Sequence, residues 1–175
     1  MEQNQTYENI VKILQAMNIA YDEIEHEEVK TTDDSREERK KAGWTEGAGS
    51  KNIVFHAKGK FYLVVTTAGN EIKAKKFKKE FGTKDIRFAY EEELMANTGC
   101  KIGAVPPFGH FNEELPIYVD SKIFEEKYFM FNPAVHTKSI RVTPENLKRI
   151  YMNVKNSVKI FEEKEDGVEF HEINR

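Results

Sequence analysis

The stretch Thr98 to His110 constrains this chain most, because it reads TGCKIGAVPPFGH in a sequence otherwise crowded with lysine and glutamate. Its two adjacent prolines fix their own φ angles, while its three glycines permit positive φ or close approach of another group. Two interpretations are open. Free backbone N–H groups of a rigid loop can bind an oxyanion or a phosphate, or the loop is a buried connection packed through Val105 and Phe108.

The length and the charge balance limit the classes of protein that this chain can belong to. A chain of 175 residues buries one good core, so a single domain over residues 1–175 is expected. The 27 basic and 30 acidic residues give a formal net charge of -3. The whole molecule is therefore not a polycation, and any contact with nucleic acid must come from a local patch.

The usage of cysteine and histidine speaks against disulfides, metal ions and other cofactors. Cys100 is the single cysteine, which excludes an internal disulfide and a cysteine-rich zinc cluster. The five histidines show no metal-ligand spacing.

The N-terminus lacks a basic start followed by an apolar run, and no apolar stretch approaches membrane-spanning length. These features predict a soluble cytoplasmic protein without a cofactor.

Hydrophobic periodicity predicts alternating helices and strands, followed by a strand-rich second half. Residues 32–43 carry helix caps but no apolar face, which favours a solvated helix or a mobile cover anchored by Trp44. Lys58 and Gly59 separate two apolar runs, as expected for a hairpin. The other predicted helices cover 7–18 with Thr6 as N-cap, 71–84, 90–97 and a segment from Thr143, and the other strands cover 21–26, 86–89, 117–119 and 139–142.

Residues 71–84 are the strongest electrostatic feature of the sequence. In a helix, Ala74, Phe77 and Phe81 would share one face and dock it. The opposite face would carry a cluster of lysines suited to nucleic-acid phosphates, namely Lys75, Lys76 and Lys79. The alternative is an ordinary solvated helix surface.

The order of several motifs resembles that of the YbaK family, the free-standing relatives of the editing domain of bacterial prolyl-tRNA synthetases. They are the glycine-rich approach to Lys51 in GAGSKNIVF, the strand KFYLVVTT, the segment IRFAYEEEL, the stretch Thr98 to His110 (the Gly/Pro loop), the strand PIYVD and FNPAVHTKSI. The match covers about residues 7–152. It implies an α+β domain with a mixed, curved, barrel-like sheet and outer helices. Residues of about 155–175 would form a C-terminal hairpin for sheet completion or self-association.

The resemblance also implies a site between the Lys51 strand and the Gly/Pro loop. Its catalytic groups would be Lys51 together with Gly103, Pro107 and Gly109. Substrate contacts would come from Asn52, Ala104, Val105, Pro106, Phe108, Asn132 and His136. Asn132 stands where several relatives carry a histidine before the proline, and an amide cannot act as an acid or base. His136, four residues later, is the candidate to replace that histidine.

The function implied is hydrolysis of a wrongly charged aminoacyl-tRNA in trans. Loop amides would hold the acyl carbonyl, and a tight pocket would favour small groups such as alanine, cysteine, serine or threonine, with tRNA(Pro) as a candidate carrier. The acceptor end of the tRNA is the expected partner, and an aminoacyl-tRNA synthetase is a second candidate.

Two other functions remain open at this point. A tRNA-binding or regulatory domain without turnover would keep the lysine cluster, and a Cys/His hydrolase would use Cys100 with His56, His110 or His136.

Overall fold

The computed structural model describes residues 2–173, which form a single α+β domain. Its helices are α1 (Glu2–Ala16), α2 (Thr32–Lys41), α3 (Lys78–Phe81), α4 (Glu91–Thr98) and α5 (Pro144–Asn153), with 3-10 turns η1 (Ala74–Phe77) and η2 (Ser121–Glu125). The strands are β1 (Asp22–Glu25), β2 (Ala48–Ala57), β3 (Lys60–Thr67), β4 (Ile86–Phe88), β5 (Ile117–Asp120), β6 (Phe129–Phe131), β7 (Lys138–Val142), β8 (Val158–Lys164) and β9 (Gly167–Glu172). The predicted fold class is confirmed.

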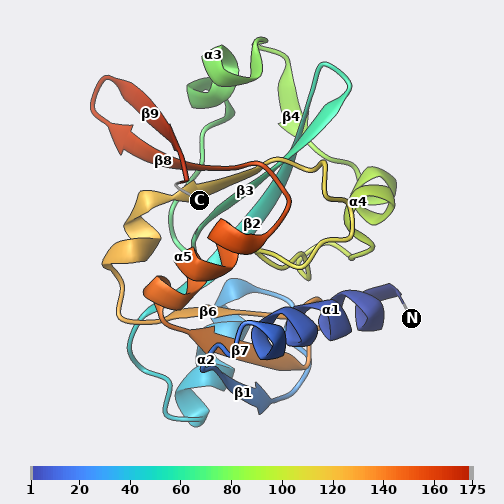
Figure 1. The fold of residues 1–175 in the computed structure, drawn as a ribbon, viewed down its shortest axis with the longest axis vertical. Coiled ribbons are helices and arrows are strands. Elements are labelled where there is room, and N and C mark those ends of the chain that lie inside the picture. The colour runs from blue at the N-terminus through green and yellow to red at the C-terminus, as the bar shows by residue number, and fades with distance from the viewer. Residues whose placement is uncertain (1, 174–175) are drawn as a thin grey trace.

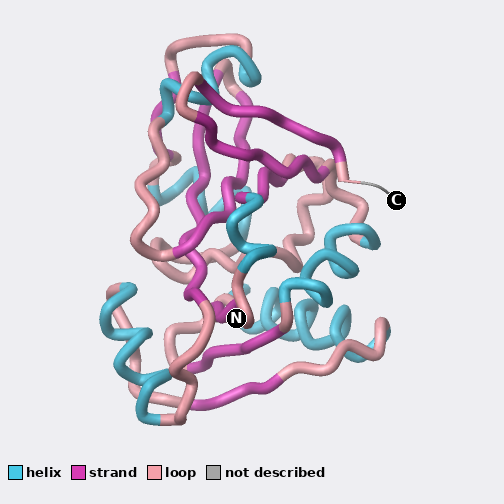
Figure 2. The backbone as a smooth tube through the Cα atoms, turned by 90° about the vertical axis from the view of Figure 1, so that its left-hand side faces the viewer, coloured by secondary structure: helices cyan, strands magenta, loops and turns pink. Residues whose placement is uncertain are grey.

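The strands form one mixed sheet in the order β1-β7-β6-β2-β3-β5-β8-β9, with β4 also paired to β2. The long strand β2 joins the two parts of this sheet. Its first residues, Ala48 and Gly49, pair in parallel with β6, and from Ser50 onward it pairs antiparallel with β3. The helices lie around the strands in both views (Figures 1 and 2).

Two β-hairpins contribute strands to the sheet: β2 with β3, and β8 with β9. Lys58 and Gly59 both have positive φ, 52° and 73°, which is the backbone of a tight two-residue turn between β2 and β3. This confirms the predicted hairpin. At the other end of the chain, β8 pairs in parallel with β5 and antiparallel with β9. The C-terminal hairpin therefore extends the sheet.

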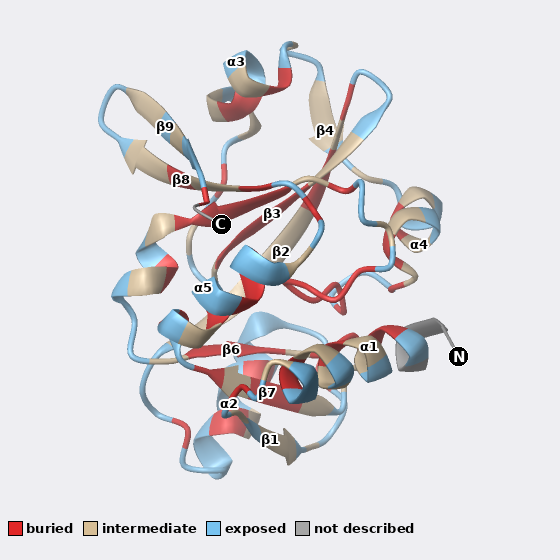
Figure 3. Cartoon of the chain, in the orientation of Figure 1, coloured by how far each residue is buried: buried red, intermediate tan, exposed pale blue. Residues whose placement is uncertain are grey.

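The core has two buried clusters. The larger one joins Ile10 and Leu14 of α1 to the Gly/Pro loop and to Leu147 of α5. The smaller one is aromatic and lies beneath the η1–α3 segment, where Phe77 and Phe81 pack on Phe55, Tyr118 and Phe161. Figure 3 shows the buried central strands in red.

Two predicted helices differ in their bounds from the structure. The first helix begins at Glu2 and ends at Ala16, so Thr6 lies inside it and is not its N-cap. The helix predicted over 71–84 is instead the turn η1 followed by the four-residue helix α3, which ends at Gly82 with φ 74°. Phe77 and Phe81 of the predicted apolar face are buried and Ala74 is half-buried, so the docking side was right and the helix length was wrong.

The helix over 32–43 is present as α2, and it is not solvated on all sides. Thr31 caps it by accepting a hydrogen bond from the Asp34 N–H at 3.0 Å. Ser35 and Arg39 are buried on the side that faces the sheet. Among residues 2–173, no helix is long and apolar enough to cross a membrane.

Candidate functional site

A pocket of about 450 Å³ opens where α2 lies against the beginning of β2. This is within the range of ligand-binding sites. Its walls also come from the turn after β3, the first part of the Gly/Pro loop and the connection between β6 and β7. Among the residues that line it are Ser35, Arg39, Gly49, Lys51, Asn52, Gly103, Val105, Asn132 and His136.

Lys51 reaches the pocket from β2, where it is paired with Thr66 of β3. The side chain is half-buried. Its Nζ donates to the carbonyl oxygen of Asn70 at 3.4 Å, a long hydrogen bond. An ammonium group has three donors, so this single contact leaves Lys51 with donors for a ligand.

Asn52 joins β2 to the Gly/Pro loop. Its Nδ2 donates to the carbonyl oxygen of Val105 at 2.8 Å and to Ser50 Oγ at 3.2 Å. These contacts fix the orientation of the amide, because a carbonyl only accepts. The Asn52 Oδ1 atom is buried and has no hydrogen-bond partner among the described residues. A buried acceptor without a partner is costly, so this atom suits a donor on a ligand.

The Gly/Pro loop contributes two residues to the pocket, and its residues from Ala104 onward are buried. Gly103 and Val105 line the pocket, whereas Ala104, Pro106, Pro107, Phe108 and Gly109 do not. Phe108 is fully buried and packs edge-on against Phe131 at a centroid distance of 5.3 Å. The loop is therefore a buried connection over most of its length and a pocket wall at its beginning.

Side chains from three other elements and from the loop itself satisfy the loop carbonyls. They are Val105 with Asn52 (2.8 Å), Pro106 with His110 (2.8 Å), Pro107 with Tyr151 (2.7 Å) and Gly109 with Asn9 (2.6 Å). Each of these bonds removes the cost of a buried, unpaired carbonyl and fixes one peptide group. The loop thus presents Gly103 and Val105 on a rigid base.

Asn132 and His136 both line the pocket, but they differ in how their polar atoms are used. Asn132 Nδ2 donates to the Lys138 carbonyl at 2.9 Å, and its Oδ1 accepts from Ser35 and Arg39 at 3.3 and 3.4 Å. Asn132 therefore ties α2 to the sheet. The ring nitrogens of His136 bond to no described residue, and its Cε1 lies 3.5 Å from the position a Cβ would take at Gly103. His136 is thus the better placed of the two to contact a ligand.

Arg39 is a pocket residue that the sequence analysis missed. It is 5% exposed, and burial lowers the pKa of its guanidinium to about 10. No pattern along the chain signals this burial, because α2 carries no apolar stripe and the contacts of Arg39 come from residues far away in sequence. Together with Lys30, Arg36, Lys40 and Lys51 it gives the pocket five cationic side chains against the single carboxylate of Asp33.

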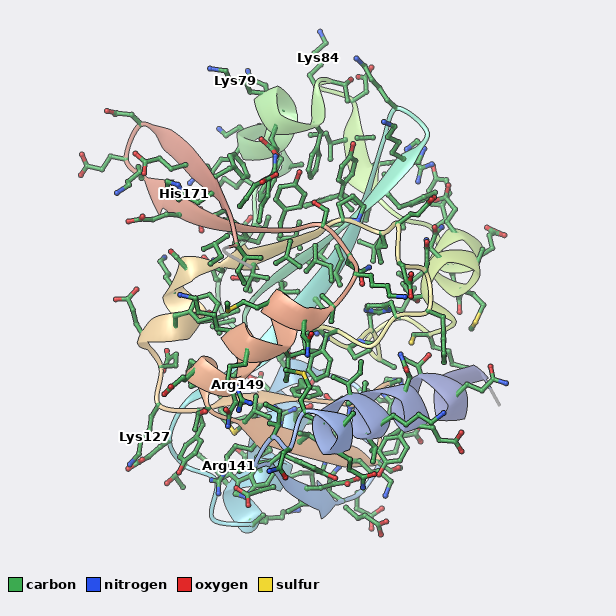
Figure 4. The ribbon with its side chains drawn as sticks, in the orientation of Figure 1. Lys79, Lys84, Lys127, Arg141, Arg149 and His171 are labelled. Atoms are coloured by element: carbon green, nitrogen blue, oxygen red, sulfur yellow. The ribbon has the colours of Figure 1, made fainter. Side chains whose placement is uncertain are left out.

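The predicted lysine cluster lies outside the pocket, and α2 and α3 lie at opposite ends of the long axis in Figures 1 and 2. Figure 4 shows Lys79 projecting from α3 away from the body of the molecule, and Lys75 is also exposed. Lys76 instead pairs with Glu163 at 2.9 Å. Only Lys75 and Lys79 of the predicted three are therefore unpaired and exposed.

Cys100 is unsuited to act as a nucleophile. The thiol is fully buried, does not line the pocket, and has a pKa raised by burial to about 11, so almost none of it is thiolate near neutral pH. His110 is also buried outside the pocket, with Nε2 bonded to the Pro106 carbonyl and a pKa lowered by burial to about 4. The pocket holds no Cys/His pair.

The fold and the pocket define an α+β domain with a cationic, polar site between a long strand and a rigid loop. Residues 26–150 match the family model of the aminoacyl-tRNA editing domain, and the chain belongs to that family. Over 74 residues, 42% of this chain and 13% of the other, it is 34% identical to the proline--tRNA ligase of Staphylococcus saprophyticus.

Two solved structures share the fold. One is a proposed trans-editing enzyme for prolyl tRNA synthetase, with a TM-score of 0.70 and 22% identity, covering 87% of this chain and 94% of that one. The other is a scaffold protein used for computational epitope grafting, with a TM-score of 0.71 and 21% identity, covering 91% and 97%.

Proposed function

We propose that this editing domain hydrolyses the ester bond of a mischarged aminoacyl-tRNA in the pocket between α2 and the Gly/Pro loop. The observation that carries the proposal is the meeting of Lys51, the unpartnered Asn52 Oδ1 and the rigid Gly103 wall in one cationic pocket. The family membership supports this reaction class, and the pocket offers groups that would perform it.

The reaction needs a water molecule to attack the ester carbonyl carbon. The ester C–O bond then breaks, the ribose oxygen takes a proton, and a free amino acid and an uncharged tRNA 3′ end leave. Because an aminoacyl ester is intrinsically reactive, positioning and charge stabilisation suffice for catalysis. Lys51 would donate to the carbonyl oxygen as negative charge develops on it. Asn52 Oδ1 would accept a hydrogen bond from the α-ammonium group of the amino acid.

Two further residues complete the proposed site. His136 would hold the attacking water, since its ring is half-buried beside Gly103 and bonds to no described residue. Val105 would limit the size of the acyl side chain, because Asn52 fixes its carbonyl and the buried loop behind it cannot move aside cheaply. Small acyl groups such as alanine, cysteine, serine or threonine are the expected substrates, with tRNA(Pro) as the candidate carrier.

Pro107, Gly109, Ala104, Pro106 and Phe108 have a supporting role in this proposal. They are buried beneath the wall and would position Gly103 and Val105 without touching the substrate. Lys75 and Lys79 would contact the tRNA body, at a distance from the chemistry.

The test is a single-turnover deacylation assay with purified alanyl-tRNA(Pro), comparing wild type with Lys51→Met. Loss of one donor to a developing oxyanion lowers the rate by about 100- to 1,000-fold. Lys148→Met is the matched control, because Lys148 is exposed on α5 and does not line the pocket. Unchanged turnover by a folded Lys51→Met protein would refute the site. A wild-type protein that binds the tRNA without turnover would instead be a binding domain.

A further inference from the structure

Arg39 is a buried cation without a counter-ion among the residues that the structure describes. Its guanidinium forms no ion pair there, and the carboxylate that lines the same pocket, Asp33, pairs with Arg36 at 2.9 Å. Figure 3 shows the buried patch on the otherwise exposed helix α2. Burying an unpaired charge is costly in free energy. The Arg39 guanidinium is therefore expected to pair with an anion when the protein binds its ligand.

The surroundings of Arg39 hold its guanidinium in one orientation. Its Nε donates to Ser139 Oγ at 3.0 Å, and one Nη2 hydrogen points to Asn132 Oδ1 at 3.4 Å. Ser139 Oγ in turn contacts His26 Nε2 at 2.9 Å, while His26 Nδ1 contacts the Glu27 carbonyl at 2.8 Å. Since a carbonyl only accepts, Nδ1 carries the proton and Ser139 donates to Nε2, which leaves Ser139 as an acceptor for Arg39.

Gly49, which has no side chain, leaves room for the Arg39 guanidinium in this orientation. A Cβ at position 49 would lie 2.8 Å from Arg39 Nη1, closer than real side chains approach. Of the five guanidinium N–H groups, two have partners among the described residues, and the other three have none. These donors belong to a side chain that lines the pocket. The guanidinium is therefore held in one orientation and keeps three N–H donors for a ligand.

We propose that Arg39 binds the 5′-phosphate of the terminal nucleotide of the acylated acceptor end, an inference that rests on the proposed function. Within an aminoacyl-tRNA end, the ester carbonyl is neutral and the phosphodiesters are the anions. A guanidinium fork matches two phosphate oxygens at once and forms strong, charge-assisted hydrogen bonds. Lys40 and Lys30, which line the same pocket, add positive charge around this subsite.

The kinetic test compares two minimal substrates, alanyl-adenosine 5′-phosphate and alanyl-adenosine without the phosphate. Wild type should prefer the phosphorylated ester in kcat/KM by about 10- to 100-fold, the worth of hydrogen bonds to a charged group. Arg39→Met should lose this preference, so that the two esters have equal kcat/KM. Lys41→Met is the control, because Lys41 lies on the same helix, pairs with Glu38 at 2.7 Å and does not line the pocket. An unchanged preference in folded Arg39→Met overturns the proposal.

Ligand-induced thermal shift tests the subsite without catalysis. Adenosine 5′-monophosphate should raise the melting temperature of wild type and of Lys41→Met, but not that of Arg39→Met, and adenosine should raise none of them. An equal shift by inorganic phosphate would make this a free-anion site and would overturn the assignment to a nucleotide. If Arg39→Met does not fold, Arg39→Lys replaces it, with the expected preference reduced about 10-fold because the planar fork is lost.

The two arms also separate this inference from the proposed function. If wild type hydrolyses neither ester, the deacylase proposal fails, and the thermal shift alone decides whether Arg39 binds a nucleotide phosphate. If wild type hydrolyses both esters at equal rates, the deacylase stands and the phosphate subsite is refuted.

Discussion

Gly109→Ala tests whether α1 packs tightly against the Gly/Pro loop. Gly109 has a φ of +94°, and a Cβ built on it would lie 2.5 Å from Cγ1 of Ile10. Ile10 is fully buried in the larger core cluster, so it cannot turn away into solvent. The new methyl group therefore meets a backbone penalty and a steric one at the same position.

The two penalties can be estimated separately. Left-handed backbone costs a residue with a Cβ roughly 1–2 kcal/mol, and an extra methyl group in a packed core costs roughly 1–3 kcal/mol. We therefore expect Gly109→Ala to lower the free energy of unfolding by roughly 2–5 kcal/mol. This is a large share of the roughly 5–15 kcal/mol that stabilises an ordinary domain.

Urea denaturation of a double-mutant cycle with Ile10→Ala separates the two terms. Removing the Ile10 side chain leaves only the backbone penalty, so Gly109→Ala should then cost roughly 1–2 kcal/mol. Costs that add without coupling would show that Ile10 does not meet position 109. A cost of Gly109→Ala near zero would refute the tight packing of α1 on the loop.

Three other predictions concern the alternatives to the site and the buried histidine. Cys100→Ser should keep most deacylation activity in a single-turnover assay, and a trapped acyl-enzyme in wild type would contradict this. The double variant Lys75→Glu with Lys79→Glu should weaken tRNA binding and flatten its salt dependence in a filter-binding assay, yet leave hydrolysis of alanyl-adenosine unchanged; an equal loss on both would point to damage of the fold. The pKa of His110 is about 4 in the folded protein, below its usual value, so the unfolded state binds more protons and stability falls as the pH drops from about 6.5 to 4. In urea titrations His110→Gln should lose this part of the decline, and an identical pH profile would contradict it.

Local sequence signals predicted the elements whose causes are local. The Lys58-Gly59 turn follows from two positions that need positive φ, and α5 follows from Thr143 as a cap and Pro144 in the first turn. The cap is seen directly, as Thr143 Oγ1 accepts from the Asn146 N–H at 3.2 Å. The family resemblance likewise predicted the fold class, because its motifs fall in the same order.

Features that depend on distant residues could not be predicted in this way. Arg39 is buried because Gly49, Asn132 and Ser139 surround it, and its hydrogen-bond partners Asn132 and Ser139 lie 93 and 100 residues away in the sequence. The segment with Lys76 was predicted as one long helix because its apolar residues recur at the spacing of successive helical turns. Its ends are decided by packing on the aromatic cluster and not by helix propensity.

The Gly/Pro loop combines a feature that its sequence predicted with one that its sequence could not predict. Its composition predicted a rigid backbone, but the division between Gly103 and Val105 in the pocket and Phe108 in the core follows from the positions of α1 and α5. The sequence therefore indicated that the loop matters and left open which of its residues meet a ligand.

The most direct test of the proposed deacylase is the hydrolysis of one tRNA(Pro) charged with alanine or with phenylalanine, followed under single-turnover conditions with the wild-type protein. The proposed pocket predicts rapid release of alanine, while phenylalanyl-tRNA(Pro) should decay at the uncatalysed rate because the rigid wall at Val105 excludes its ring. Equal rates for the two esters, or no hydrolysis of either, would contradict it.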